Sequence, residues 1–326
     1  ASTGDTEVIL KAWKEWGPDA VPKLHGMFAF AIHNRETGRV AFVRDRFGIK
    51  PLYLAETPGR LAFASTLPAL LKAGEVDTSI DRVALHHYMT WHAVVPAPRT
   101  ILNGIRKLPA ATIRMVEPDG SHRDTTYWEP DFERSAEDAT RSGAEWAEMV
   151  LEALRVSVRR RMVADVPVGV LLSGGVDSSL IVGLLAEEGQ KNLATYSIGF
   201  EAAHGESGDE YEFSDLIADH YGTNHHKIFI ASDEMRTNLP HAIAAQSEPM
   251  VSYDNIGFFL LSREVSKTIK VVQSGQGADE VFGGYHWYPP MRSSNDPVAD
   301  YAAAFFDRSH ARLAEHLSPD YLADRD

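Results

Sequence analysis

The sequence predicts an α/β protein in two parts, and three observations support this. Two apolar stretches, 26–32 and 40–43, flank a turn-rich segment, which is typical of neighbouring antiparallel strands. From Ala144 onward, helical and strand patterns alternate, which is typical of a parallel sheet covered by helices. Between them, residues 129–143 are rich in charge and lack apolar periodicity, so they are the best candidate for a linker.

The first part begins with a helical pattern. Residues 5–16 place Val8, Ala12 and Trp16 on one apolar stripe, and Gly17-Pro18 ends the pattern. Residues 61–64 offer a third strand, and residues 80–89 form a further helical stretch. We expect this part to be one portion of a β-sandwich.

Length, composition and charge limit the functional classes. With 326 residues, 44% of them hydrophobic, two domains with sizeable cores are expected. The formal charge of −14 disfavours nucleic acid and anionic membranes as partners, so small-molecule substrates are expected. The chain shows no apolar run long enough to span a bilayer and no leader pattern, which predicts a cytoplasmic protein.

The residue types present exclude some chemistry. These 326 residues contain no cysteine, which rules out disulfides, thiolate zinc sites and a cysteine nucleophile within them. The 14 histidines are scattered, and a metal site built from the adjacent pairs His86-His87 and His225-His226 is not expected.

The second part is centred on residues 166–188, where a Val- and Leu-rich strand runs into the turn SGGVDSS and then a helix. Gly174 and Gly175 permit backbone angles that are closed to other residues, so successive amides can point into one concavity. The helix is expected to begin at Ser178 or Ser179 and to add its positive end. Asp177 supplies a carboxylate for magnesium. We therefore predict a phosphate cradle.

Two common phosphate-binding motifs do not fit this turn. A Walker loop needs a lysine that is missing between Arg161 and Lys191, and the dinucleotide pattern G-x-G-x-x-G is also not matched. The simpler alternative is a Gly-Ser turn that caps a helix and binds nothing.

The remaining elements of the second part alternate. Helix 144–162, strand 193–200, helix 206–221, strand 225–230, helix 256–267 and strand 271–273 are predicted, and residues 293–326 are amphipathic and helical. Gly199 lies where an adenine can rest against backbone. After the last strand, SGQGADE can place Asp279 opposite Asp177, so that both carboxylates hold magnesium against pyrophosphate. The alternative is a solvent-exposed acidic turn.

Several motifs carry a resemblance to known families. SGGVDSS resembles the pyrophosphate loop of the ATP-pyrophosphatase (adenine nucleotide α-hydrolase-like) superfamily. DTEVIL, GMFAFAI and RDRFGIKPLY resemble the later part of a class II, N-terminal-nucleophile glutamine amidotransferase. Together they resemble the asparagine synthetase (glutamine-hydrolysing) family. The implied fold is a partial α+β glutaminase sandwich followed by a parallel-sheet ATP-pyrophosphatase domain.

The resemblance also implies a division of the chain. Residues 1–75 match the later part of the glutaminase, 76–143 a connecting segment whose small hairpin ends at Tyr127-Trp128, and 144–326 the synthetase domain. The family's nucleophilic cysteine and its C-terminal helices have no counterpart here, so we interpret the sequence as a piece of a longer polypeptide.

For the reaction, the resemblance implies a ligase that uses ATP and Mg²⁺ to adenylate a carboxylate, releases pyrophosphate and transfers ammonia from glutamine. Catalytic roles fall to Asp177, Asp279 and Gln276, metal binding to Asp177 and Asp279, and glutamine binding to Asp5, which as a simpler alternative is a helix N-cap. The expected ATP-binding residues are Leu172, Ser173, Gly174, Gly175, Asp177, Ser178, Ser179, Ile198, Gly199, Ser274 and Gly275.

The acceptor carboxylate stays open. Aspartate is the family's usual acceptor, but Gln276 stands where several members have glutamate, and a neutral amide cannot accept a proton. The aromatic stretch 286–291, with SGQGADE and SEPMVS, resembles relatives that amidate an acetylated glutaminylglutamine peptide. A tRNA-modifying enzyme and a non-catalytic nucleotide-binding relative are the remaining alternatives, and a homodimer is one option for the assembly.

Overall fold

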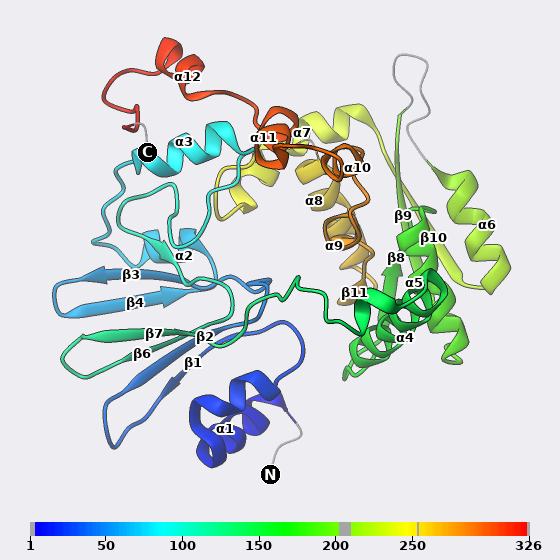
Figure 1. Ribbon diagram of the computed structural model, residues 1–326, viewed down its shortest axis with the longest axis horizontal. Coiled ribbons are helices and arrows are strands. Elements are labelled where there is room, and N and C mark those ends of the chain that lie inside the picture. Colours follow the sequence, from blue (N-terminus) through cyan, green and yellow to red (C-terminus); the bar gives the residue numbers. More distant parts are fainter. Residues whose placement is uncertain (1–3, 202–209, 253, 325–326) are drawn as a thin grey trace. The chain divides into compact units, whose positions relative to one another are not determined.

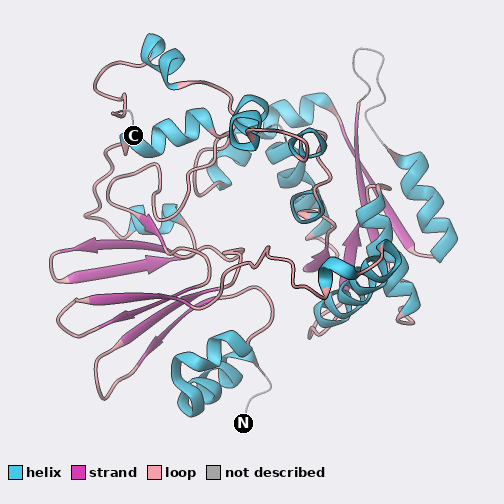
Figure 2. Ribbon diagram, viewed as in Figure 1, coloured by secondary structure: helices cyan, strands magenta, loops and turns pink. Residues whose placement is uncertain are grey.

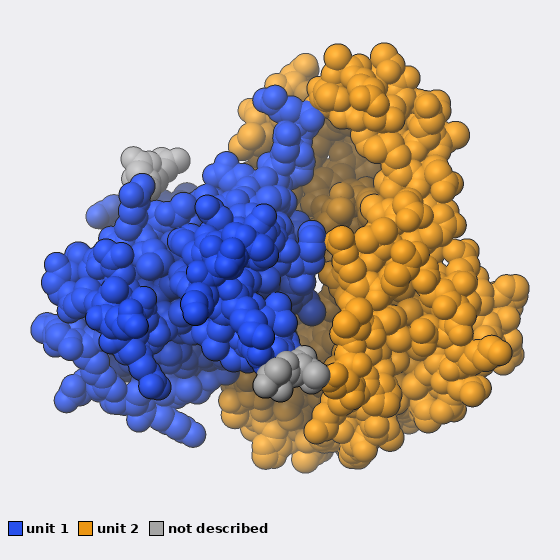
Figure 3. Space-filling view, turned by 90° about the horizontal axis from the view of Figure 1, so that it is seen from below, with its two compact units in different colours: residues 1–133, 247–250, 305–326 blue, residues 134–246, 251–304 orange. Residues whose placement is uncertain are grey.

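The computed structural model describes residues 4–201, 210–252 and 254–324 (Figure 1). The chain separates into two compact units, coloured in Figure 3. Unit 1 contains residues 1–133, 247–250 and 305–326, and unit 2 contains residues 134–246 and 251–304. The domain limits predicted from the sequence, 1–75, 76–143 and 144–326, stay a prediction.

Unit 1 opens with helix α1, Asp5–Trp16, at the predicted residues, and Gly17 ends it with a φ of 57°. The short 3-10 helix η1, Gly17–Lys23, follows. The expectation that Asp5 caps α1 is wrong, because Gly4 occupies the N-cap position and no side chain caps the helix. Asp5 is instead the first helical residue, where a negative charge is favoured by the helix dipole.

The first two predicted strands of unit 1 lie in an antiparallel sheet with the order β1-β2-β6-β7 (Figure 2). Its strands are β1 (Ala29–His33), β2 (Val40–Arg44), β6 (Thr112–Val116) and β7 (His122–Thr126). The hairpin expected before Tyr127 is thus β6–β7, and it extends the sheet formed by the first two strands. The two hairpins pair through β2 and β6 although the sequence separates them, because their alternating apolar side chains share one buried face.

A second antiparallel sheet in unit 1 has the order β4-β3-β5, with β3 at Tyr53–Thr57, β4 at Arg60–Ala64 and β5 at Arg106–Lys107. The third strand predicted at 61–64 is therefore present as β4, but it pairs with β3 and not with the first two strands. Phe42 from the first sheet and Leu54 from the second belong to one buried cluster, so the sheets face each other as a sandwich. Helices α2, Leu67–Lys72, and α3, Arg82–Thr90, complete this part of unit 1.

The turn after β2 is held by charged side chains. The Asp45 carboxylate is 1% exposed and accepts hydrogen bonds from the backbone amides of Phe28, Phe47, Ile49 and Lys50 at 2.9–3.3 Å. Arg44 donates to the carbonyl oxygens of Gly48, Lys50 and Leu108. The first residues of RDRFGIKPLY thus form the turn itself, because their charges satisfy backbone groups that no strand would satisfy.

The predicted linker, residues 129–143, crosses the limit between the two units after residue 133, and before α4 only its short η2, Asp138–Thr140, is helical. Ser142 and Glu145 form a capping box at the start of α4, Gly143–Arg161. The first helix of the second part therefore begins one residue before the predicted position.

The strands of unit 2 form the predicted parallel sheet, in the order β10-β9-β8-β11. They are β8 (Val168–Leu171), β9 (Ala194–Phe200), β10 (Asn224–Ile230) and β11 (Val271–Gln273). One buried cluster joins β8 to α4, to α5 (Val176–Glu187) and to α6 (Tyr211–Tyr221), and another joins Tyr196 of β9 to α8 (Asp254–Val265) (Figure 1). Helices therefore cover both faces, and the α/β class is confirmed.

Two further helix starts in unit 2 differ from the predictions. Helix α5 begins at Val176 and not at Ser178 or Ser179, because Gly175 already takes the N-cap position. Helix α8 begins two residues before the predicted 256. The predicted start of α6 at 206 lies outside the described residues, and the described helix begins at Tyr211.

The helical character expected for residues 293–326 is found in the described part of this segment, in α11 (Pro297–Phe305) and α12 (His310–His316). Helices α7 (Ser232–Ala245), α9 (Ala278–Phe282) and α10 (Tyr288–Met291) lie in segments for which the sequence analysis predicts no helix. In unit 1, α12 packs on α3, where the rings of His86 and His310 lie 5.3 Å apart between centroids. No helix among the described residues combines the length and the apolar character that a bilayer crossing requires.

Candidate active site

The order of the parallel strands determines where a site can form. From β8 the chain moves to β9 and then to β10 on one side, and it returns to β11 on the other side of β8. The strand order therefore reverses between β8 and β11, and the carboxyl ends of strands at such a switch point are the place where open α/β sheets bind ligands. The turn after β8 begins at Leu172 and the turn after β11 at Ser274.

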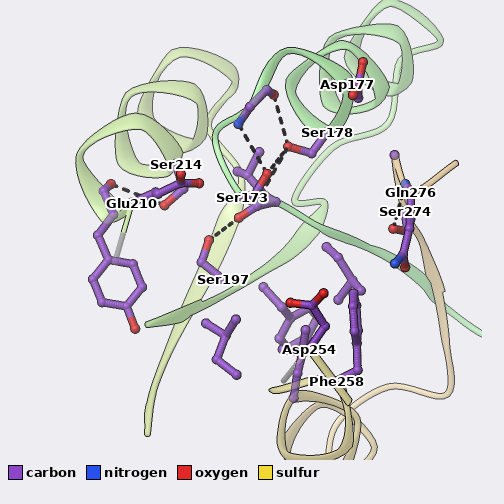
Figure 4. Close-up of a pocket in the computed structure, with 18 of the residues that line it drawn as sticks. Ser173, Asp177, Ser178, Ser197, Glu210, Ser214, Asp254, Phe258, Ser274 and Gln276 are labelled. Carbon is purple, nitrogen blue, oxygen red and sulfur yellow. Dashed lines mark hydrogen bonds between the residues drawn. The ribbon is translucent and has the colours of Figure 1, made fainter. Parts of the chain in front are cut away.

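A cavity of about 830 Å³ lies at this place within unit 2 (Figure 4). Ten of the predicted site residues line it: Leu172, Ser173, Gly175, Asp177, Ser178, Ile198, Ser274, Gly275, Gln276 and Asp279. They come from two turns and the middle of β9, which are far apart in the sequence. The structure thus brings most of the predicted nucleotide-binding and catalytic residues together, while their individual roles stay predictions.

Four predicted residues do not line the cavity. Gly174, Ser179 and Gly199 are absent from its walls, and Asp5 belongs to unit 1. Gly174 has a φ of +90°, and a Cβ there would lie 2.5 Å from Cβ of Phe213, so it lets the turn pass against α6. Gly175 has an ordinary φ of −67°, so the expectation that both glycines need special backbone angles is wrong for it.

The turn after β8 is braced by its own hydroxyl groups (Figure 4). The Ser173 amide donates to Oγ of Ser178 at 3.2 Å, and the Ser178 hydroxyl donates to the Gly175 carbonyl oxygen at 3.2 Å. The Gly175 amide in turn donates to Oγ of Ser173 at 3.3 Å. These bonds fix the conformation of the turn, so a ligand that binds here would meet a preorganised backbone. Ser179 Oγ is buried without a hydrogen-bond partner in the described part of the chain.

The two turns touch through backbone at Gly275. A Cβ at this position would lie 2.9 Å from both Cβ of Asp177 and the amide nitrogen of Ser178, which is closer than real Cβ atoms approach. Only glycine therefore allows the β11 turn to lie directly against the first turn of α5. On the same turn, the backbone amide of Gln276 donates to Oγ of Ser274 at 3.1 Å. Asp279 follows in the first turn of α9.

The charge of the cavity is one-sided. Of the described residues that line it, four carry carboxylates and none is lysine or arginine; the carboxylates belong to Asp177, Glu210, Asp254 and Asp279. The described residues contain no cluster of three or more acidic or histidine side chains arranged to hold a metal by themselves. An anionic ligand would therefore be repelled here unless cations accompanied it.

The aromatic stretch after α9 packs on itself and does not line the cavity. The rings of Tyr285 and Trp287 are stacked with centroids 4.4 Å apart. The Tyr285 hydroxyl donates to Oε1 of Glu280 at 2.8 Å, and this bond together with burial raises the pKa of Tyr285 to about 12. The stretch thus holds α9, the helix that carries Asp279.

Sequence reasoning missed several residues that line the cavity. Ser197 in β9, Glu210 and Ser214 at the start of α6, and Phe258 of α8 line the cavity without having been predicted as site residues. For Ser197 a signal exists, since a hydroxyl residue inside an apolar strand needs a hydrogen-bond partner. The others come from helices whose approach to the sheet has no local signature.

These features define a class: a parallel α/β domain with a cavity at its switch point, preceded in the sequence by a β-sandwich. The family model described as asparagine synthase matches residues 149–325, and the one described as glutamine amidotransferase domain matches residues 1–128. The chain belongs to the asparagine synthase family.

Similar proteins carry matching names. A Mycobacterium tuberculosis relative, provisionally named a glutamine-hydrolyzing asparagine synthetase, is 37% identical over 88% of this chain and 44% of its own length. The glutamine-hydrolyzing asparagine synthetase 1 of Bacillus subtilis is 34% identical over 87% of this chain and 43% of its own. The chain thus spans about half the length of these relatives. An NH₃-dependent NAD synthetase from Campylobacter jejuni aligns with a TM-score of 0.30 and 13% identity, covering 54% of this chain and 90% of that one, and supports no conclusion.

Proposed function

We propose that the protein containing this chain is a glutamine-dependent, ATP-consuming amide synthetase that works on small molecules in the cytoplasm. An acceptor carboxylate oxygen attacks the α-phosphorus of ATP, the bond to the bridging oxygen breaks, and pyrophosphate leaves. Ammonia released from glutamine then attacks the acyl carbon, the amide forms, and AMP leaves with the electron pair of the acyl–oxygen bond.

The observation that carries this proposal is the meeting of two turns in one cavity. The turn SGGVDSS and the turn SGQGADE line it from β8 and β11, and Ile198 lines it from β9. The amides at the start of α5 have no intrahelical acceptors and favour negative charge, which suits pyrophosphate. Leu172 and Ile198 offer backbone and apolar surface for the adenine.

The four carboxylates of the cavity support a requirement for Mg²⁺, because a triphosphate alone would meet only like charge there. Asp177 and Asp279 are the residues that would hold the ion, with the remaining ligands from phosphate and water, as Mg²⁺ prefers. When bound, Mg²⁺ would neutralise charge that develops on pyrophosphate. Gln276 can donate or accept a hydrogen bond to the intermediate, but it cannot take a proton.

The test is ATP–pyrophosphate exchange by the intact polypeptide, with aspartate and acetylated glutaminylglutamine offered in separate reactions. Exchange with aspartate would assign the usual acceptor of the family. Exchange with the peptide alone would assign the alternative acceptor. No exchange with either, in an enzyme that still hydrolyses glutamine, would argue against the proposed synthetase activity on both compounds.

A further inference from the structure

Ser197 holds the backbone in one wall of the cavity. It lies in β9, is 5% exposed and lines the cavity, and its hydroxyl donates to the carbonyl oxygen of Leu172 (Figure 4). The Leu172 amide donates to the carbonyl oxygen of Tyr196 at 2.8 Å. The backbone amide and the backbone carbonyl of Leu172 are therefore both held by β9, at the point where the turn SGGVDSS begins.

Behind Ser197 lies a histidine that does not line the cavity. Nε2 of His225 is 3.3 Å from Oγ of Ser197, and Nδ1 of His225 is 2.8 Å from Oγ1 of Thr195. Oγ1 of Thr195 is also 2.8 Å from Oγ1 of Thr223. The His225 side chain is 10% exposed and Thr195 is fully buried.

Counting hydrogens assigns a direction to these bonds. The Ser197 hydroxyl hydrogen is used on Leu172, so Ser197 Oγ can only accept a hydrogen from His225, which must carry it on Nε2. A neutral imidazole has one N–H, so Nδ1 accepts from Thr195, and Thr195 accepts from Thr223. Each donor in this chain of bonds is thereby satisfied once.

The surroundings favour the neutral ring. Burial lowers the pKa of His225, and the nearby Lys227 and His226 act in the same direction. Asp215 and a backbone hydrogen bond with Thr195 oppose this lowering of the pKa, but burial is the largest effect, and the Asp215 carboxylate lies 3.9 Å from Nε2 and is already paired with Lys227 at 2.8 Å. At neutral pH the ring is therefore the single-donor form that the bonding pattern requires.

We propose that His225 is a positioning residue for the ATP site, acting through Ser197 on the Leu172 carbonyl and so on the phosphate-binding turn. The inference rests on the proposed function, since it assigns a task within the same cavity. A histidine that only filled space between β10 and α6 would not need a directed bond to a residue of the cavity wall.

The experiment compares His225→Leu, His225→Gln, Ser197→Ala and the double variant S197A/H225L in the intact polypeptide. The affinity for magnesium-ATP is measured by calorimetry, and KM for ATP and for the acceptor by pyrophosphate exchange. We expect H225L and S197A each to weaken ATP binding roughly three- to tenfold, the size of one hydrogen bond. The double variant should be no weaker than the single ones, because both remove the same link.

Two features separate positioning from a general structural role. Glutamine keeps a side-chain N–H, so H225Q should recover ATP affinity to within about twofold, while KM for the acceptor should not change in any variant. His241→Leu removes an exposed histidine from α7 and serves as the matched control. If H225L does not fold, S197A and H225Q still decide the question.

Wild-type ATP affinity in both S197A and H225L would overturn the inference. Losses of affinity that add up in the double variant would also overturn it. A wild-type protein that binds no magnesium-ATP would overturn the proposed function itself, and the inference with it. The two failures are therefore distinguishable.

Discussion

Nζ of Lys107 lies 2.9 Å from Oε1 of Glu248, a residue 141 positions further along the chain. The Tyr53 hydroxyl donates to the same oxygen at 3.2 Å, and the Lys107 and Glu248 side chains are only 15% and 17% exposed. Burial and the Glu248 carboxylate raise the pKa of Tyr53 to about 12, so its hydroxyl stays a donor at neutral pH. Residues 247–250, which interrupt unit 2 in the sequence, are thus bonded within unit 1.

This pair predicts a stability effect. Lys107→Met leaves a half-buried carboxylate without its cation, and we expect a loss of about 2 kcal/mol in the free energy of unfolding, somewhat below the cost for a fully buried pair. Lys72→Met, at an exposed position of α2, is the matched control. Urea denaturation measures both, and replacing Glu248 by Met as well should recover most of the loss. An unchanged midpoint for Lys107→Met would contradict the expectation.

Gly275 gives a steric prediction. Gly275→Ala places a methyl group against Asp177 and Ser178, so the turn must shift, and we expect the affinity for magnesium-ATP to fall at least about tenfold, the equivalent of 1.4 kcal/mol. Gly143→Ala adds a methyl group to the start of α4, where no atom lies within 4 Å, and should leave binding unchanged. Calorimetric titration with magnesium-ATP compares the two. Equal affinities would show that the two turns do not need their close approach.

The histidines predict how stability depends on pH. Burial lowers the pKa of His86, His87 and His225 from the ordinary value near 6.5. As the pH falls through that value, the unfolded chain takes up protons before the folded one, so stability is complete above it and is lost on acidification, with a slope of at most about 1.4 kcal/mol per pH unit for each proton. Urea midpoints at about pH 7.5 and 5.5 measure this.

A variant isolates one of these groups. His86→Phe keeps an aromatic ring beside His310 but cannot be protonated, so it should flatten the loss of stability on acidification. His122→Phe, at an exposed position of β7, should not. A wild-type protein that gained stability when the pH was lowered from the higher to the lower of the two values would contradict the assignment.

The proposed magnesium ligands predict a metal-dependent effect. Asp177→Asn and Asp279→Asn should each lower pyrophosphate exchange roughly 100-fold, because charge on the leaving group is then less well neutralised. A thermal shift assay provides the second readout: ATP should raise the melting temperature of the wild type with Mg²⁺ and much less with a chelator. Asp320→Asn, at an exposed position near the C-terminus, is the control. Full activity in both aspartate variants would exclude these ligands.

Most local elements could be predicted from the amino-acid sequence. The residues of α1, β2 and β11 agree with the predicted limits to within one residue, because apolar periodicity and the glycine after a helix act over a few neighbouring positions. The turn SGGVDSS was recognisable for the same reason. Helix α5 started earlier than expected because its N-cap is a glycine without a side chain to mark it.

The contacts between distant elements could not be predicted in this way and are known from the three-dimensional fold. Three features depend on how distant apolar faces bury one another. They are the strand order that brings together the turns after β8 and β11, the pairing of β4 with β3, and the bond from Lys107 to Glu248. Ser197 shows the limit best, since its sequence neighbours reveal neither Leu172 nor His225. Local patterns fix backbone conformation over a few residues, whereas a site is assembled by packing across the whole chain, and that information is not local.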